Sequence, residues 1–148
     1  WRPISEGPFE QTDARSQEDW LASEIAAGRP QVHAATSEQF IPQMLNLDLL
    51  DGVSFTKGCY TGQEIVARTH HLGRVKRRTL RFHVATGTVP APLSNLLLDG
   101  AKAAQVLMAA RTFDGIELLA VASLDAAGKL LQLEDGRVAE PRALPYGW

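Results

Sequence analysis

The sequence predicts an α+β protein in which a helical and irregular part precedes a small six-stranded antiparallel β-barrel. Helix-type spacing with helix stop signals occurs only before Gly73. From Arg74 onward, short strand patterns follow one another with close turns and no helix pattern between them. We therefore divide the chain into residues 1–73 and residues 74–148.

The first part contains two predicted helices. Ser16 begins the first, with Asp19 in a capping-box-like pair, and Gly28 followed by Pro30 ends it. The second is short, begins near Thr61 or Gly62, and stops at Gly73. Residues 1–13 have no periodicity and indicate a connector.

The second part reads as a series of short strands. Leu80, Phe82 and Val84 alternate with Arg81 and His83, the pattern of a half-buried strand. Further strands are expected at 95–98, 103–110, 116–123, 129–133 and 137–140, separated by turns at 99–100, 114–115, 127–128 and 135–136. We expect Arg81 and His83 to point outward. The inward set is Leu80, Phe82, Val84, Val106, Met108, Leu119 and Val121.

The composition is that of an ordinary globular protein, with 45% hydrophobic and 22% charged residues. No apolar run approaches the ~20 residues that a membrane span needs, so we expect no membrane contact. The single cysteine, Cys59, rules out an internal disulfide and favours a reducing compartment, which predicts a cytoplasmic protein. The chain opens at Trp1 without a methionine, and we expect further residues upstream.

Positive charge is concentrated between Lys57 and Arg81. This stretch carries a net charge of +6, so the remainder carries −8. It could be a solvated basic surface, or it could attract a polyglutamyl tail, a nucleic acid or an acidic partner. RNA binding usually adds aromatic residues among the cations, and none lies between Arg74 and Arg81, so direct RNA binding is not expected.

Cys59 stands in the densest segment of the sequence. Lys57 lies two residues before it, Gly58 and Gly62 flank it, and a helix is predicted to begin just after it. A cation and a helix N-terminus both favour the thiolate over the thiol, which is the environment of a reactive cysteine. The alternative is a small buried hydrophobic residue, and the local sequence leaves both open.

The segment Lys57-Gly58-Cys59-Tyr60-Thr61-Gly62-Gln63-Glu64 resembles the signature of the YgfZ family, which is related to the glycine-cleavage T-protein, a tetrahydrofolate-dependent aminomethyltransferase. The resemblance extends from about Gln17 to the C-terminus. It includes Trp20-Leu21-Ala22, Phe40-Ile41-Pro42-Gln43, Ile65-Val66-Ala67-Arg68 and Leu144-Pro145-Tyr146.

The resemblance implies the end of a folate-binding T-protein-like domain followed by the barrel. It implies a protein that binds tetrahydrofolate or a derivative and supports assembly or repair of iron–sulfur enzymes, including enzymes that modify tRNA. Its expected partners are folate, iron–sulfur client proteins and an N-terminal part of the same protein. Whether folate is turned over or only bound stays open.

The resemblance also implies roles for individual residues. Cys59 is the reactive group with Lys57 beside it. Trp20 would contact the pterin ring, and Tyr60, Gln63 and Arg68 are the further candidates for folate binding. From the residues alone, a tryptophan on an apolar helix face such as Trp20 is more often a core residue than a ligand contact. Gln63 could cap the helix start, and Arg68 could pair with Glu64 one turn before it.

Two other functions remain as alternatives, an aminomethyltransferase of the T-protein type and an RNA-binding module. In the aminomethyltransferases the corresponding loop usually has an acidic residue in place of Cys59, so the cysteine argues against glycine cleavage. A thiolate is a soft ligand that suits iron and sulfur chemistry. We expect no metal site at His70 and His71, because they lack partners at ligand spacing.

Overall fold

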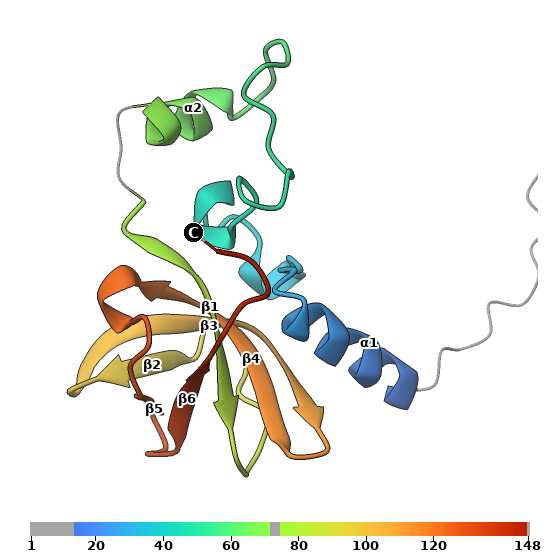
Figure 1. The fold of residues 1–148 in the computed structure, drawn as a ribbon, viewed down its shortest axis with the longest axis vertical. Coiled ribbons are helices and arrows are strands. Elements are labelled where there is room, and N and C mark those ends of the chain that lie inside the picture. Colours follow the sequence, from blue (N-terminus) through green and yellow to red (C-terminus); the bar gives the residue numbers. More distant parts are fainter. Residues whose placement is uncertain (1–13, 72–74, 148) are drawn as a thin grey trace, which may run out of the picture.

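The computed structural model describes residues 14–71 and 75–147, in which two helices lie outside a β-barrel (Figure 1). The α-helices are α1 (Ala14–Ala26) and α2 (Gln63–His71), and three 3-10 turns are η1 (Ala34–Thr36), η2 (Pro42–Leu45) and η3 (Leu124–Ala126). The strands are β1 (Arg77–Val84), β2 (Asn95–Leu98), β3 (Ala101–Thr112), β4 (Gly115–Ser123), β5 (Leu131–Leu133) and β6 (Val138–Arg142).

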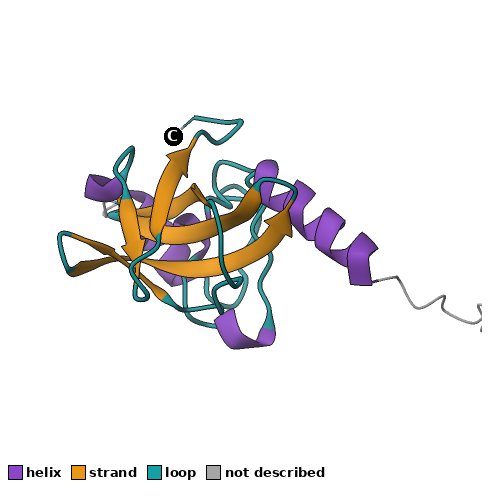
Figure 2. Cartoon of the chain, turned by 90° about the horizontal axis from the view of Figure 1, so that it is seen from below, coloured by secondary structure: helices purple, strands orange, loops and turns teal. Residues whose placement is uncertain are grey.

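The strands close into the antiparallel barrel that the sequence predicts (Figure 2). Their order around the barrel is β1-β4-β3-β2-β5-β6. β1 pairs with β4 along its whole length, from Arg77 opposite Ser123 to Val84 opposite Ile116. The barrel closes where His83 of β1 lies opposite Glu140 of β6. The turn between β2 and β3 could be predicted from its Asp-Gly pair. Asp99 and Gly100 both have positive φ, as a two-residue hairpin turn requires.

The barrel interior is filled by one face of each strand. Leu80, Phe82 and Val84 of β1 and Val106 of β3 lie there as predicted, and Phe82 is wholly buried. Leu118 and Ala120 of β4 complete this layer, although the sequence prediction named their neighbours instead.

The prediction that Met108, Leu119 and Val121 point inward is wrong. These residues are buried, but in a second cluster with Ile25 of α1 and Leu45 of η2, on the outer face of β3 and β4. On β4 the cause is alternation, since Leu118 faces the interior and Leu119 the opposite side.

On β3 the cause is a bulge at Leu107, which has no partner because Val106 lies opposite Ala120 and Met108 opposite Leu119. The extra residue exchanges the two faces of the strand beyond it.

Arg81 and His83 lie on the outer face as predicted, but His83 is buried there. Arg81 Nε donates to Glu117 at 2.7 Å, and the other oxygen of Glu117 lies 3.1 Å from His83 Nδ1. The predicted register of β1 is therefore right. His83 points outward but is not exposed, because Glu117 of β4 lies against it.

Helix α1 ends as the sequence indicates but begins two residues earlier, at Ala14 instead of Ser16. Gly28 has a φ of 67°, its N–H donates to the Ile25 carbonyl, and the Arg29 N–H donates to the Glu24 carbonyl. This pair of bonds is a Schellman motif with glycine in the left-handed position.

Helix α2 begins at Gln63, next to the predicted start. Its predicted stop and the division of the chain, both at Gly73, fall within residues 72–74, outside the described residues. Over the described part of the chain, none of the helices has the length and apolar character required to traverse a membrane.

Candidate functional site

The loop before α2 presents Cys59 to solvent. Cys59 is a free, exposed thiol, so the alternative of a small buried hydrophobic residue does not hold. The loop backbone is fixed on both sides of it. The Lys57 N–H donates to Ser54 Oγ at 3.2 Å, and the Tyr60 N–H donates to Gln63 Oε1 at 3.2 Å. The thiol therefore stands on a loop whose flanks are held in place.

Lys57 and Tyr60 are in direct contact beside this thiol. The Lys57 ammonium lies 4.6 Å from the centroid of the Tyr60 ring, a cation–π distance. This contact keeps a positive charge within the loop instead of leaving it on a freely rotating side chain.

The other two candidates in this segment differ in their surroundings. The Gln63 carbonyl oxygen is engaged by the Tyr60 N–H, so the contact seen for it is a structural one at the helix start. Arg68 is exposed on α2, and within the described residues no ion pair joins it to Glu64. The ring of His70 is stacked on Phe55 with centroids 3.8 Å apart, which ties α2 back to the chain before the loop.

Trp20 lies on α1 with half of its surface exposed, so it is not buried within the described part of the chain. It borders a hollow of about 270 Å³ whose other walls are Gln17, Glu18, Leu21 and His33. The resemblance assigned Trp20 to a pterin ring, and a flat, half-exposed indole beside a hollow is compatible with stacking. The hollow is smaller than the ~300–1,000 Å³ typical of ligand pockets, so these residues can form only part of such a site.

The structure does not bring Trp20 to Cys59. Lys57, Cys59 and Tyr60 lie on the loop before α2, and Gln63 and Arg68 lie on α2 itself, whereas Trp20 is on α1. Figure 1 shows α1 and α2 on different sides of the molecule. The six candidates therefore form two separate groups in the described part of the chain, with Trp20 in one and the other five in the other.

Both groups are connected through η2 and Asn46, which sequence reasoning did not single out. Gln43 of η2 donates through Nε2 to the Val66 carbonyl of α2 at 2.7 Å. Asn46 donates to the Thr79 carbonyl of β1 at 2.8 Å and to the hydroxyl of Tyr146 at 3.3 Å. The available signals were the family-like segments Phe40-Ile41-Pro42-Gln43 and Asn46-Leu47, which belong to the resemblance but do not indicate these contacts.

Part of the predicted basic surface is neutralised inside the protein. Arg78 makes two hydrogen bonds to the carboxylate of Asp48, at 3.0 and 2.9 Å, and Arg81 is paired with Glu117. Arg77 donates to the Val121 carbonyl. Arg74 lies outside the described residues. An anion approaching the stretch from Lys57 to Arg81 therefore meets fewer available cations than the sequence suggests.

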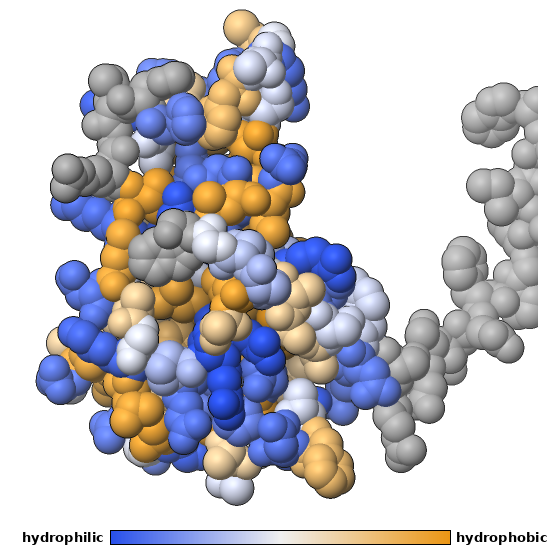
Figure 3. Space-filling model, viewed as in Figure 1, coloured by the Kyte–Doolittle hydropathy of each residue, from blue (hydrophilic) through white to orange (hydrophobic). Residues whose placement is uncertain are grey.

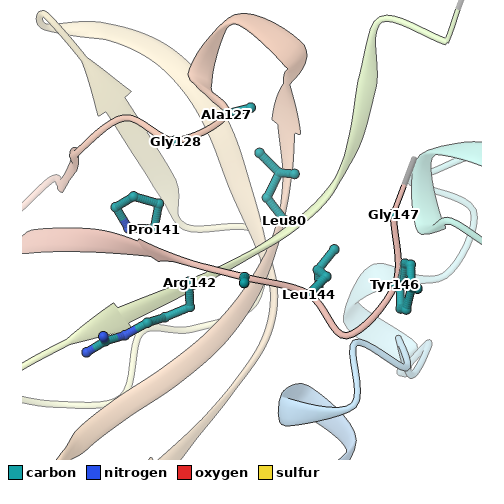
Figure 4. Close-up of a pocket in the computed structure, with 9 residues that line it drawn as sticks. Leu80, Ala127, Gly128, Pro141, Arg142, Leu144, Tyr146 and Gly147 are labelled. Atoms are coloured by element: carbon teal, nitrogen blue, oxygen red, sulfur yellow. The ribbon is translucent and has the colours of Figure 1, made fainter.

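A larger hollow, of about 480 Å³, lies elsewhere (Figure 4). It is formed by Leu80 of β1, the turn at Ala127 and Gly128, and the final segment from Pro141 to Gly147. It contains none of the predicted site residues. Apolar surface also shows below the part that carries α2 (Figure 3). Leu47, Leu49 and Leu50, in the segment before the Cys59 loop, are half-buried.

Side chains that could bind a metal ion are dispersed in the described part of the chain. No group of three or more His, Cys, Asp or Glu side chains among residues 14–71 and 75–147 is placed to hold a metal ion.

Comparison with known proteins identifies the family. No protein-family model matches the chain. The tRNA-modifying protein YgfZ of Serratia proteamaculans is 41% identical over 133 residues, which cover 85% of this chain and 40% of that protein. Proteins of the same name from Hamiltonella defensa and Yersinia pestis are 57% identical over 63 residues and 53% identical over 72 residues. Those two alignments cover 43% and 49% of this chain, and 19% and 22% of the respective relatives.

The chain spans about 40% of the length of its Serratia relative. The similarity covers most of this chain, and the chain belongs to the YgfZ family.

Proposed function

We propose that this chain is part of a folate-binding accessory protein that supports tRNA modification by maintaining iron–sulfur enzymes, with Cys59 as its reactive group. The tRNA-modifying name of the relatives supports the general role. Folate binding and iron–sulfur maintenance come from the family resemblance of the segment from Lys57 to Glu64.

The observation that carries the proposal is the exposed thiol on a fixed loop. An accessible cysteine on a loop that also carries a lysine has surroundings compatible with a reactive thiol, whereas structural cysteines are buried and inert. Thiolates also bind iron in iron–sulfur clusters, so Cys59 could serve as a ligand as well as a nucleophile. In either role, the chain supplies one sulfur and its partners would supply the cluster or substrate.

Folate would occupy the face of α1 that carries Trp20. When bound, folate supplies a carrier for one-carbon groups. The role of this chain is to stack the pterin ring on the half-exposed indole of Trp20. The hollow beside Trp20 is too small to enclose the whole ligand. The rest of the site would come from the polypeptide by which the relatives exceed this chain.

The test is folate binding and iron–sulfur enzyme activity, measured for the intact natural protein and for these 148 residues alone, each with and without Cys59→Ser. We expect the intact protein to bind folate in both forms and to lose its support of iron–sulfur enzymes only in the serine form. Folate turnover in the presence of a one-carbon donor would instead support the aminomethyltransferase alternative.

A further inference from the structure

Helix α2 is attached to the rest of the molecule by a small set of contacts. Of its described side chains, only Val66 is buried, and Glu64, Ile65, Arg68 and His70 are exposed. A helix of nine residues is marginal by itself in water, so its position depends on the contacts it makes with other elements.

One of these contacts comes from the buried side chain of Gln43. This residue is 1% exposed, and its Nε2 donates to the Val66 carbonyl at 2.7 Å. Its backbone carbonyl accepts a bond of 3.2 Å from Arg78 Nη1 on β1. Gln43 therefore connects α2 directly to a strand of the barrel.

The other end of the same side chain is unsatisfied. Gln43 Oε1 is buried and has no hydrogen-bond partner among the described residues. A buried, unpaired oxygen is destabilising, and an apolar side chain of similar volume, such as methionine, would avoid it. The stability of the packed interior therefore does not explain why an amide side chain occupies position 43. The directional hydrogen bond to the Val66 carbonyl does explain it.

We propose that Gln43 is a positioning residue that fixes α2, and with it the Cys59 loop, against β1 of the barrel. The bond to Val66 sets where α2 lies, and the Gln63 side chain at the start of α2 holds the Tyr60 N–H next to Cys59. The importance of Gln43 for activity rests on the proposed function of Cys59. The position that Gln43 gives to α2 does not depend on that function.

Amide hydrogen exchange in the intact natural protein tests this for the Gln43→Met variant. We expect the amides of α2 to exchange about five- to tenfold faster, as loss of one net hydrogen bond predicts. Amides of β1 and β4 should keep their rates, and Tm should be unchanged or higher because the unpaired oxygen is gone. Gln43→Asn, whose amide is too short to reach Val66, should show the same acceleration and carries the test if the methionine variant does not fold.

The matched control is Gln132→Met on β5, where the side chain is exposed. In this variant the amides of α2 and of the barrel strands should keep their exchange rates. Unchanged exchange in α2, equal acceleration of α2 and the barrel, or no protection of α2 in the unaltered protein would each overturn the proposal. If Cys59→Ser proves fully active, the proposed function fails while the exchange result still decides the role of Gln43.

Discussion

The hydroxyl of Tyr146 donates a 2.6 Å hydrogen bond to the carbonyl oxygen of Gly28, across 118 positions in the sequence. Gly28 terminates α1, and Tyr146 belongs to the segment that follows β6. The same hydroxyl accepts a bond from Asn46, which also binds the Thr79 carbonyl of β1. The end of α1, the residue after η2 and one strand of the barrel are therefore held together around one phenol group.

The first prediction concerns Gly28→Ala. The φ of 67° is unfavourable for alanine, and a Cβ atom would lie 2.7 Å from Tyr146 Cε1 and 2.8 Å from Leu144 Cδ2. We expect a loss of about 2–4 kcal/mol in the free energy of unfolding, from left-handed strain together with overpacking. Urea denaturation measures it.

Gly100→Ala is the matched control, because Gly100 also has positive φ but no atom lies within 4 Å of its added Cβ. It should lose only the conformational part, about 1–2 kcal/mol. Equal losses at both positions would show that the contact between Gly28 and Tyr146 contributes little.

The second prediction concerns alkaline pH and Tyr146. Burial raises the pKa of Tyr146 above its ordinary value of 10.0, although the hydrogen bond from Asn46 and the charge of Arg78 lower it in part. A raised pKa in the folded state means that the stabilising contribution is complete below about pH 10 and is lost as pH rises through the folded value. The stability advantage of the natural protein over Tyr146→Phe should therefore shrink above pH 10.

Chemical denaturation at pH 8 and at pH 11 measures this advantage. The control is Tyr60→Phe, compared with the natural protein at the same two pH values, because Tyr60 lies on the Cys59 loop away from this contact. Its difference from the natural protein should not show the same decline. An advantage over Tyr146→Phe that is the same at both pH values would contradict the prediction.

The barrel could be predicted from the sequence because its signals are local. The alternation of Leu80, Phe82 and Val84 with polar residues indicates which face of β1 is inside the barrel. Turn sequences such as Asp99-Gly100 indicate where the strands end. The predictions that failed depended on contacts between residues far apart in the sequence. Alternation cannot show that α1 covers the outer face of β4, so Leu119 was placed on the wrong side, and a bulge such as that at Leu107 has no sequence signature here.

The candidate site was predictable only in part for the same reason. The loop around Cys59 carries its own glycines and cation, so its place just before a helix could be anticipated. The local sequence leaves open whether Cys59 is exposed or buried, and the structure shows that it is exposed. The contacts of Gln43 and Asn46 depend on residues 23 and 33 positions away, and nothing adjacent to either residue indicates them. A polar residue that acts through distant backbone carbonyls leaves no local pattern.

The third prediction concerns Trp20→Ala in the intact natural protein. Trp20 is half exposed, so its removal should change Tm little, whereas a stacked aromatic ring contributes about 1–3 kcal/mol to binding a flat ligand. We expect the Kd for tetrahydrofolate to rise about tenfold or more, measured by calorimetry.

Phe113→Ala is the control, because Phe113 is a fully exposed aromatic residue on the turn between β3 and β4 and should not affect folate. Normal binding by the Trp20 variant would remove Trp20 from the folate site.

The fourth prediction concerns the reactivity of Cys59. Because the thiol is exposed and Lys57 is held beside Tyr60 in the same loop, we expect Cys59 to be alkylated near neutral pH faster than a cysteine in an unstructured peptide. A nearby cation at the surface contributes about 0.3–1 kcal/mol to stabilising an anion, so Lys57→Met should slow the reaction by about two- to fivefold. Lys102→Met, which removes an exposed cation from β3, should leave the rate unchanged.

The cellular counterpart of this experiment uses Cys59→Ser. Serine is close to cysteine in size but binds iron poorly and is a weak nucleophile without a base, so a working thiol cannot be replaced by it. We expect iron–sulfur enzyme activity to fall to the level seen without the protein, while folding, followed by Tm, is retained because Cys59 makes no buried contact. A thiol that is alkylated no faster than a cysteine in an unstructured peptide, together with a fully active serine variant, would leave Cys59 as an ordinary surface residue. The chemistry would then have to lie elsewhere in the protein.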